Sequence, residues 1–146
     1  MGVGMACGDE TECGPTEAVV VRVYDGDTIE LDSGERVRYL LVDTPELTGD
    51  PECYATEATQ FNRTLVEGKT VQLSYDAQCT DRYDRLLAYI SINGASVNER
   101  LISQGYACVL QIPPNGEDRA AAYRQLQTDA QADLVGLWGT CAEVPC

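Results

Sequence analysis

Three short segments place charged side chains beside apolar runs, and these are the segments that could carry chemistry. They read DGDT at residues 25–28, RYLLVDTPE at residues 38–46 and TDRYDR at residues 80–85. A charge next to a buried strand usually needs a partner or a ligand, because an unpaired charge away from water is costly. The three segments are therefore interpreted together.

The first two segments supply oxygen atoms. Asp25 and Asp27 lie on a predicted turn, Asp43 ends the apolar run, and Thr44 adds a backbone carbonyl. Hard oxygen ligands without nitrogen or sulfur suit Ca²⁺ or Mg²⁺. A DGDT turn is also a common hairpin connector with solvated carboxylates, so this segment alone leaves both interpretations open.

Two arginines complete the candidate site. Arg38 lies on a predicted strand and Arg85 opens another, in a chain with nine arginines. Planar guanidinium groups that converge on one pocket favour an anion held in a bidentate manner. The alternative is an arginine–aspartate network on the surface.

The elements that must position these groups follow from the apolar patterns. Residues 18–24, 28–31 and 35–42 predict three strands joined by turns at 25–27 and 32–34, which form a meander. Pro45 cannot donate to a sheet, so the third strand must end before it. A helix over about residues 56–67 has an apolar stripe of Ala58, Phe61 and Leu65, and Gly68 ends it.

The second half of the chain predicts two further strands and two further helices. The strands cover residues 70–75 and 86–92. One helix runs from 96 to 104, where Ser96 and Glu99 form a capping box, and another from 117 to about 133. Five strands with a helix after the third predict an α+β fold: a five-stranded OB-fold β-barrel with about three helices. The predicted organisation is a flexible leader (1–17), one domain (18–140) and a cysteine-containing tail (141–146).

Composition limits the classes of function. The 146 residues suit one domain, and no run approaches the roughly 18 apolar residues of a membrane span. The formal net charge is −14, with Lys69 the only lysine, so the surface repels nucleic acid at long range. This argues against a non-specific DNA coat protein, and any chemistry on nucleic acid must depend on local positive charge or a cation.

Seven cysteines are many for this length. They form no CxxC pair and the chain has no histidine, which argues against zinc. Scattered cysteines predict disulfides and an oxidising compartment, hence a secreted or cell-envelope protein.

Residues 1–7 are either the remnant of a lipoprotein signal, with a lipid anchor on Cys7, or a cloning start. The pairing hypotheses are Cys53–Cys79, Cys108–Cys141 in preference to Cys108–Cys146, and Cys13 with the remaining tail cysteine, leaving Cys7 free or modified.

Taken together, the segments resemble the staphylococcal nuclease-like, or thermonuclease, domain family. The similar blocks are the three segments above, LAYI at 87–90, VNE at 97–99 and GLW at 136–138, in order over residues 18–139. The resemblance implies an OB-fold phosphodiesterase that depends on Ca²⁺, cleaves DNA and RNA, and leaves 3′-phosphates. It implies a monomer without an obligate protein partner, which prefers single-stranded substrates.

The resemblance also implies a role for each matching residue. In catalysis, Glu46 would be the general base that activates water, while Arg38 and Arg85 would hold the phosphate. The other implied roles are calcium binding by Asp27, Asp43 and the Thr44 carbonyl, support of that site by Asp25, and nucleotide contact by Arg82 and Tyr83.

Three departures from the family pattern matter. Residues 111–114 read QIPP where members carry stacking tyrosines, Asp84 replaces a usual glycine, and the loop from 46 to 54 is shorter. Weaker base binding is therefore expected, because stacking contributes roughly 1–3 kcal/mol per base. The predicted function is a calcium-dependent endonuclease with relaxed sequence preference. The alternatives are a non-catalytic OB-fold module that binds an oligonucleotide or another anion, and a structural cell-surface domain.

Overall fold

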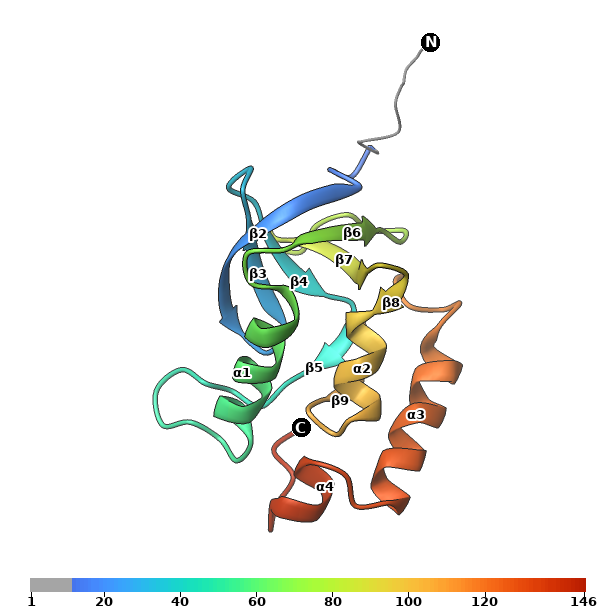
Figure 1. Cartoon of the computed structure of the whole chain (residues 1–146). Helices are drawn as coiled ribbons and strands as arrows, with labels where there is room; N and C mark the ends of the chain where they lie inside the picture. Colours follow the sequence, from blue (N-terminus) through green and yellow to red (C-terminus); the bar gives the residue numbers. More distant parts are fainter. Residues whose placement is uncertain (1–11) are drawn as a thin grey trace.

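The computed structural model describes residues 12–146, and its centre is a closed β-barrel (Figure 1). The sheet order is β4-β3-β2-β6-β7-β8, and β4 also pairs with β7 in parallel, which closes the barrel. The predicted five-stranded OB-fold barrel is confirmed. Its strands are β2 (Glu17–Asp25), β3 (Thr28–Leu31), β4 (Arg36–Tyr39), β6 (Thr70–Ser74) and β7 (Leu86–Ile92), with the two-residue β8 (Ala95–Ser96) at the edge.

The core fills the barrel because inward and outward side chains alternate along its strands. Ile29 and Leu31 of β3 are fully buried, and so is Val37 of β4, whereas Arg36 on the outer face of β4 is exposed. The register pairs Ile29 with Val37 and Glu30 with Arg36. The outer face of β3 and β4 therefore carries the polar residues of these strands.

The third predicted strand, residues 35–42, is wrong as a single element. The chain breaks at Leu40 into β4 and β5 (Leu41–Asp43), and Leu41 has a φ of 64°. Buried Asn98 holds this break, because its amide donates to the Leu40 carbonyl at 2.9 Å while its oxygen accepts from Ile90 N at 2.8 Å. The segment β5 leaves the barrel and pairs with β9 (Cys108–Leu110).

Two helices lie against the barrel, a third packs beside the second of them, and a short fourth follows (Figure 1). They are α1 (Ala55–Val66), α2 (Val97–Ser103), α3 (Ala120–Ala132) and α4 (Leu137–Thr140). Ser96 Oγ accepts from Glu99 N at 3.1 Å, which confirms the predicted N-cap of α2. Residues 117–119 form turns before α3, so that helix starts later than predicted. None of the helices in residues 12–146 is long and apolar enough to cross a membrane.

Two of the three disulfide pairing hypotheses are wrong: Cys53 and Cys79 do not pair with each other, and Cys13 does not pair with the tail. Cys108 does pair with a tail cysteine, but with Cys146, the less favoured alternative, and not with Cys141. Cys7 lies outside the described residues. The observed bridges are Cys13–Cys79, Cys53–Cys141 and Cys108–Cys146.

Residues 12–16 of the predicted leader lie against the barrel. Thr16 O accepts from Leu73 N at 2.8 Å, and Pro15 O accepts from Tyr75 Oη. The Cys13–Cys79 bridge ties the same segment to the loop between β6 and β7. This part of the chain is therefore attached to the loop that precedes Arg85.

Candidate active site

The turn between β2 and β3 positions Asp27, which is only 6% exposed. Its Oδ2 accepts from Thr44 N at 3.0 Å and from Thr44 Oγ1 at 3.1 Å, and its Oδ1 accepts from Thr28 Oγ1 at 3.0 Å. A Cβ on Gly26 would lie 2.6 Å from Thr44 Cγ2, so glycine is required for this close approach. The turn is thus joined to the end of β5.

Arg38 on β4 connects the two predicted metal carboxylates. Its Nη2 lies 3.3 Å from Asp27 Oδ2 and 3.5 Å from Asp43 Oδ1. Its Nη1 donates to the carbonyls of Tyr39 at 2.8 Å and Val42 at 2.6 Å. The guanidinium is therefore fixed in orientation on the strand, with both carboxylates on one side of it.

The carboxylates of this region are crowded. Burial, and then the charge of Asp27, raises the pKa of Asp25 to about 7. Burial also raises the pKa of Asp43; Arg38 opposes this, while the charges of Asp27 and Glu46 add to it. Excess negative charge with partial burial is an environment that a divalent cation would stabilise.

The donor set fits a hard cation. Asp27 and Asp43 converge on Arg38, and Thr44, which follows Asp43, is hydrogen-bonded to Asp27. Within residues 12–146, no group of three or more acidic, cysteine or histidine side chains is arranged to hold a metal by itself. Two carboxylates, one carbonyl and water remain a suitable oxygen set for Ca²⁺, whose coordination is flexible.

Asn62 supports the carboxylate turn, a role that was not predicted from the sequence. This residue of α1 is fully buried, donates to the Asp25 carbonyl at 3.0 Å and accepts from Tyr39 Oη at 2.7 Å. An amide beside the apolar stripe of a helix was the available signal, since a buried polar group needs partners.

Asp81 positions Arg85, a role that the sequence analysis also missed. Asp81 Oδ1 accepts from Tyr83 N at 2.9 Å and Arg85 N at 3.0 Å. Its Oδ2 accepts from Arg85 Nε at 2.9 Å and lies 2.8 Å from Nη2. Burial raises the pKa of Asp81, but the hydrogen bonds from Arg85 and Tyr83 outweigh it and hold the pKa below its usual value. The i, i+4 spacing of an aspartate and an arginine in a turn was the signal.

Tyr83 lies between two arginines of the same loop. Arg82 Nη2 donates to Tyr83 Oη at 2.8 Å, and the guanidinium carbons of Arg82 and Arg85 are 4.9 Å and 5.3 Å from the ring centroid. The residue is still 55% exposed. A nucleotide could therefore contact the ring and both cations at once.

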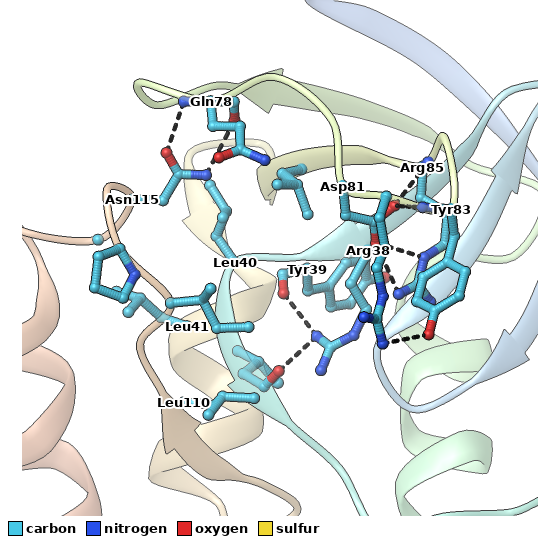
Figure 2. A pocket seen from close by; sticks show the side chains of 16 residues that line it. Arg38, Tyr39, Leu40, Leu41, Gln78, Asp81, Tyr83, Arg85, Leu110 and Asn115 are labelled. Carbon is cyan, nitrogen blue, oxygen red and sulfur yellow. Dashed lines mark hydrogen bonds and ion pairs between the residues drawn. The ribbon is translucent and has the colours of Figure 1, made fainter.

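A pocket of about 460 Å³ lies between β4 and these loops (Figure 2). Arg38 and Arg85 both line it, with Arg82 and Tyr83 on the loop wall. Leu110, Ile112 and Pro113 form part of an apolar wall. An apolar wall beside two guanidinium groups suits a ligand with an anionic part and an apolar part.

One side-chain clamp joins the two walls of the pocket. Asn115 Oδ1 accepts from Gln78 N at 2.8 Å, and Asn115 Nδ2 donates to Gln78 O at 3.0 Å. Asp76 Oδ2 accepts from Gly116 N at 2.8 Å, which adds a second link between the same loops. Figure 2 shows Asn115 and Gln78 meeting at the edge of the pocket opposite Tyr83.

The structure brings most predicted site residues together and places Glu46 separately. Glu46 is exposed on the loop after β5, and its backbone is held by Glu52, which accepts from Glu46 N at 2.6 Å and donates its own N to Glu46 O at 2.9 Å. The charge of Glu46 raises the pKa of Asp43, so the two carboxylates are within electrostatic range.

Comparison with known proteins gives a consistent result. A model of the family described as staphylococcal nuclease homologue matches residues 36–140. The chain is 36% identical over 124 residues to a protein named Endonuclease YncB of Bacillus subtilis (strain 168), a match that covers 80% of this chain and 59% of that protein. It is 36% identical over 127 residues to a Thermonuclease of Staphylococcus intermedius, covering 82% of this chain and 74% of the other.

A second staphylococcal protein gives a similar match. The chain is 36% identical over 126 residues to a Thermonuclease of Staphylococcus hyicus, covering 82% of this chain and 73% of that one. The chain spans only 59% and 42% of the length of two Bacillus subtilis relatives. The similarity to those proteins therefore concerns one part of each.

Proposed function

The chain belongs to the family of staphylococcal nuclease homologues, and from this premise we propose that it is a nuclease. Its substrates are DNA and RNA, cut within the strand with relaxed sequence preference and with single strands favoured. The reaction depends on Ca²⁺ and leaves 3′-phosphates. Relatives named Thermonuclease and Endonuclease support this activity.

One observation carries the proposal. Arg38 contacts Asp27 and Asp43 and at the same time lines the pocket that Arg85 lines from the opposite loop. Hydrolysis of a phosphodiester requires the phosphate to be held beside the groups that offset its developing charge. Arg38 lies where the carboxylates and the pocket meet, which is the place for that phosphate.

Asp27, Asp43 and the Thr44 carbonyl would hold the Ca²⁺, with Asp25 nearby. When bound, the cation supplies positive charge against the phosphate oxygens. The raised pKa values of Asp25 and Asp43 support this assignment, because burial and the neighbouring carboxylates outweigh the charge of Arg38 at both groups.

The remaining steps fall to side chains. Arg85 uses Nε and Nη2 on Asp81, so its Nη1 is the atom available for a phosphate oxygen. Glu46 accepts a proton from the water that attacks phosphorus. The bond from phosphorus to the 5′-oxygen breaks, this oxygen takes up a proton, and the phosphate remains on the 3′-oxygen. Tyr83 and Arg82 contact the adjoining nucleotide.

The cysteines support an oxidising location. Three disulfides within residues 12–146 are compatible with a secreted or cell-envelope protein. A lipid anchor on Cys7 is part of this proposal. Mass spectrometry of the protein isolated from its native cells would test the anchor directly.

The test of function is an incubation with single-stranded DNA, with Ca²⁺ or with excess chelator. Cleavage in Ca²⁺ only, with products that a 3′-phosphatase modifies, is expected. Arg38→Ala and Glu46→Ala should each lower turnover by at least about 10²-fold. Arg100→Ala is the matched control, because Arg100 is exposed on α2, outside the pocket. Binding without cleavage would favour the non-catalytic OB-fold module instead, and full cleavage in chelator would refute the metal assignment.

A further inference from the structure

The outer face of β3 and β4 continues beyond the candidate site. The register pairs Thr28 with Arg38 and Glu30 with Arg36, so Arg36 and Arg38 project from the same face of β4. Val37 between them is fully buried on the other face. Residues two apart on a strand are separated by about 6.5–7 Å.

Arg36 differs from Arg38 in its partners. It is exposed, and its side chain makes neither a hydrogen bond nor an ion pair within residues 12–146. Arg38 and Arg85, in contrast, are each bound to aspartates. A guanidinium without such a partner keeps its full donor capacity for an external anion.

Strand β2 extends this charged surface. Arg22 pairs with Glu30 in the register, and its guanidinium lies 4.5 Å from the ring centroid of Tyr24. Tyr24 Oη donates to Glu30 Oε1 at 2.5 Å, which engages one oxygen of this carboxylate and leaves its charge in place. We call Arg22, Tyr24, Glu30 and Arg36 the outer arginine patch; its charges sum to +1 in a chain of net charge −14.

The geometry points to the outer arginine patch as a binding site for the phosphodiester backbone of the substrate strand, next to the phosphate that Arg38 and Arg85 hold. This inference rests on the proposed function and deepens it. Arg36 continues the line of Arg38 on β4, and the outer face of strands two and three is where OB-folds bind oligonucleotides. Elsewhere the negative surface repels a polyanion, so a local cationic track is needed to hold the strand.

The patch predicts a dependence on substrate length. A dinucleotide, d(TpT), fills only the catalytic phosphate site, whereas an oligothymidylate of about a dozen nucleotides also reaches the patch, within the roughly 4–16 nucleotides of an OB-fold site. The gain in kcat/KM from the short to the long substrate therefore measures how much the patch contributes to substrate binding. Arg36→Ala and Arg22→Ala should each reduce this gain about fivefold, through KM and not kcat.

Salt dependence gives a second readout. For each phosphate of a single strand that a variant no longer neutralises, the slope of log KM against log salt should decrease by about 0.7. Arg100→Ala is again the control and should keep the wild-type gain and slope. An unchanged gain in Arg36→Ala, or an equal loss in Arg100→Ala, would show that Arg36 is only a solvated surface charge.

A failure of the proposed nuclease function can be distinguished from a failure of the outer arginine patch. If the wild-type protein cleaves neither substrate, the nuclease proposal fails, and the patch is tested by fluorescence anisotropy of a labelled oligothymidylate. Weaker binding by Arg36→Ala than by wild type and Arg100→Ala would then support the patch. Equal affinity in all three proteins would overturn it.

Discussion

Arg38 and Arg85 face the same pocket from regions that are built differently. Arg38 lies on a barrel strand, shares two carboxylates and donates to two backbone carbonyls. Arg85 follows an exposed loop and depends on Asp81, which also organises the backbone of that loop. We refer to these regions as the carboxylate side and the loop side.

The difference lies in the balance of charge. On the carboxylate side, Asp27 and Asp43 share one arginine, Asp25 adds a third carboxylate beside Asp27, and burial raises the pKa of Asp25 and Asp43. On the loop side, Asp81 and Arg85 pair one to one, and the pKa of Asp81 is lowered despite its burial. The carboxylate side is therefore expected to respond to a cation, whereas the loop side is organised without one.

Asp27→Asn should have the largest effect. The amide oxygen can still accept from Thr44 N, but the negative charge is lost, so turnover should fall by at least about 10³-fold. The free energy of unfolding in chelator should change by no more than about 1 kcal/mol, because Asp25 loses a neighbouring charge while Arg38 loses one of its two carboxylate partners. Rates on single-stranded DNA and urea titrations would measure both.

Asp118→Asn is the control for this prediction, because Asp118 is an exposed carboxylate before α3. It should change neither quantity. A wild-type rate in Asp27→Asn, or a large loss of its stability in chelator, would contradict the description of the carboxylate side as overcharged.

Removal of the Cys13–Cys79 bridge tests the loop side. The double variant Cys13→Ser, Cys79→Ser should lose about 2–4 kcal/mol of unfolding free energy. Turnover should also fall several-fold at temperatures where the protein stays folded, because Cys79 lies two residues before Asp81. The control is Cys108→Ala with Cys146→Ser, which removes a bridge to the tail.

The control should lose comparable stability and keep its turnover. If both double variants lose turnover to the same extent, the bridge near Asp81 has no special role in holding Arg85. Urea titrations and initial rates on the same preparations separate the two effects.

The sequence was sufficient to predict the barrel because its strands alternate and its turns contain glycine, aspartate and asparagine. It failed at Leu40, because the break of the strand depends on Asn98, which lies 58 residues away. Local propensity favoured continuation through an apolar run, and a distant amide hydrogen bond decided against it.

The predictions of site residues likewise succeeded where local sequence pattern was sufficient and failed where contacts between distant segments decide. Residue types and turns were enough to select Asp27, Arg38 and Asp43, and these converge in the structure. The predicted Cys53–Cys79 bridge failed because two loops that border the same site need not meet each other. Asp81 was missed although its i, i+4 spacing to Arg85 was visible in the sequence, because residue types alone do not show whether such a pair forms.

The pH dependence of the free energy of unfolding should distinguish the carboxylate side from the loop side. In chelator, the folded pKa of Asp25 lies at about 7, above its unfolded value of 3.8, so the folded state binds more protons between these values. Stability should therefore fall as pH rises from about 4 to 7, by about 1–2 kcal/mol from this group. Urea midpoints at pH 5 and pH 7 would measure it, and Asp25→Asn should flatten the difference. The same slope in Asp25→Asn would assign the effect to another group.

Asp81→Asn is expected to give the smallest effect and the sharpest comparison. The amide oxygen can still accept from Tyr83 N and Arg85 N, so the turn should persist, but the amide nitrogen cannot accept from Arg85 Nε. Arg85 then loses its orientation, and turnover should fall about fivefold, which corresponds to about 1 kcal/mol of transition-state stabilisation.

The Ca²⁺ concentration for half-maximal rate should not change in Asp81→Asn, because no group of the carboxylate side is altered. Asp27→Asn should raise that concentration strongly. Rates over a Ca²⁺ series for both variants would measure this, and a shifted Ca²⁺ requirement in Asp81→Asn would show that the two sides are coupled through the phosphate they share.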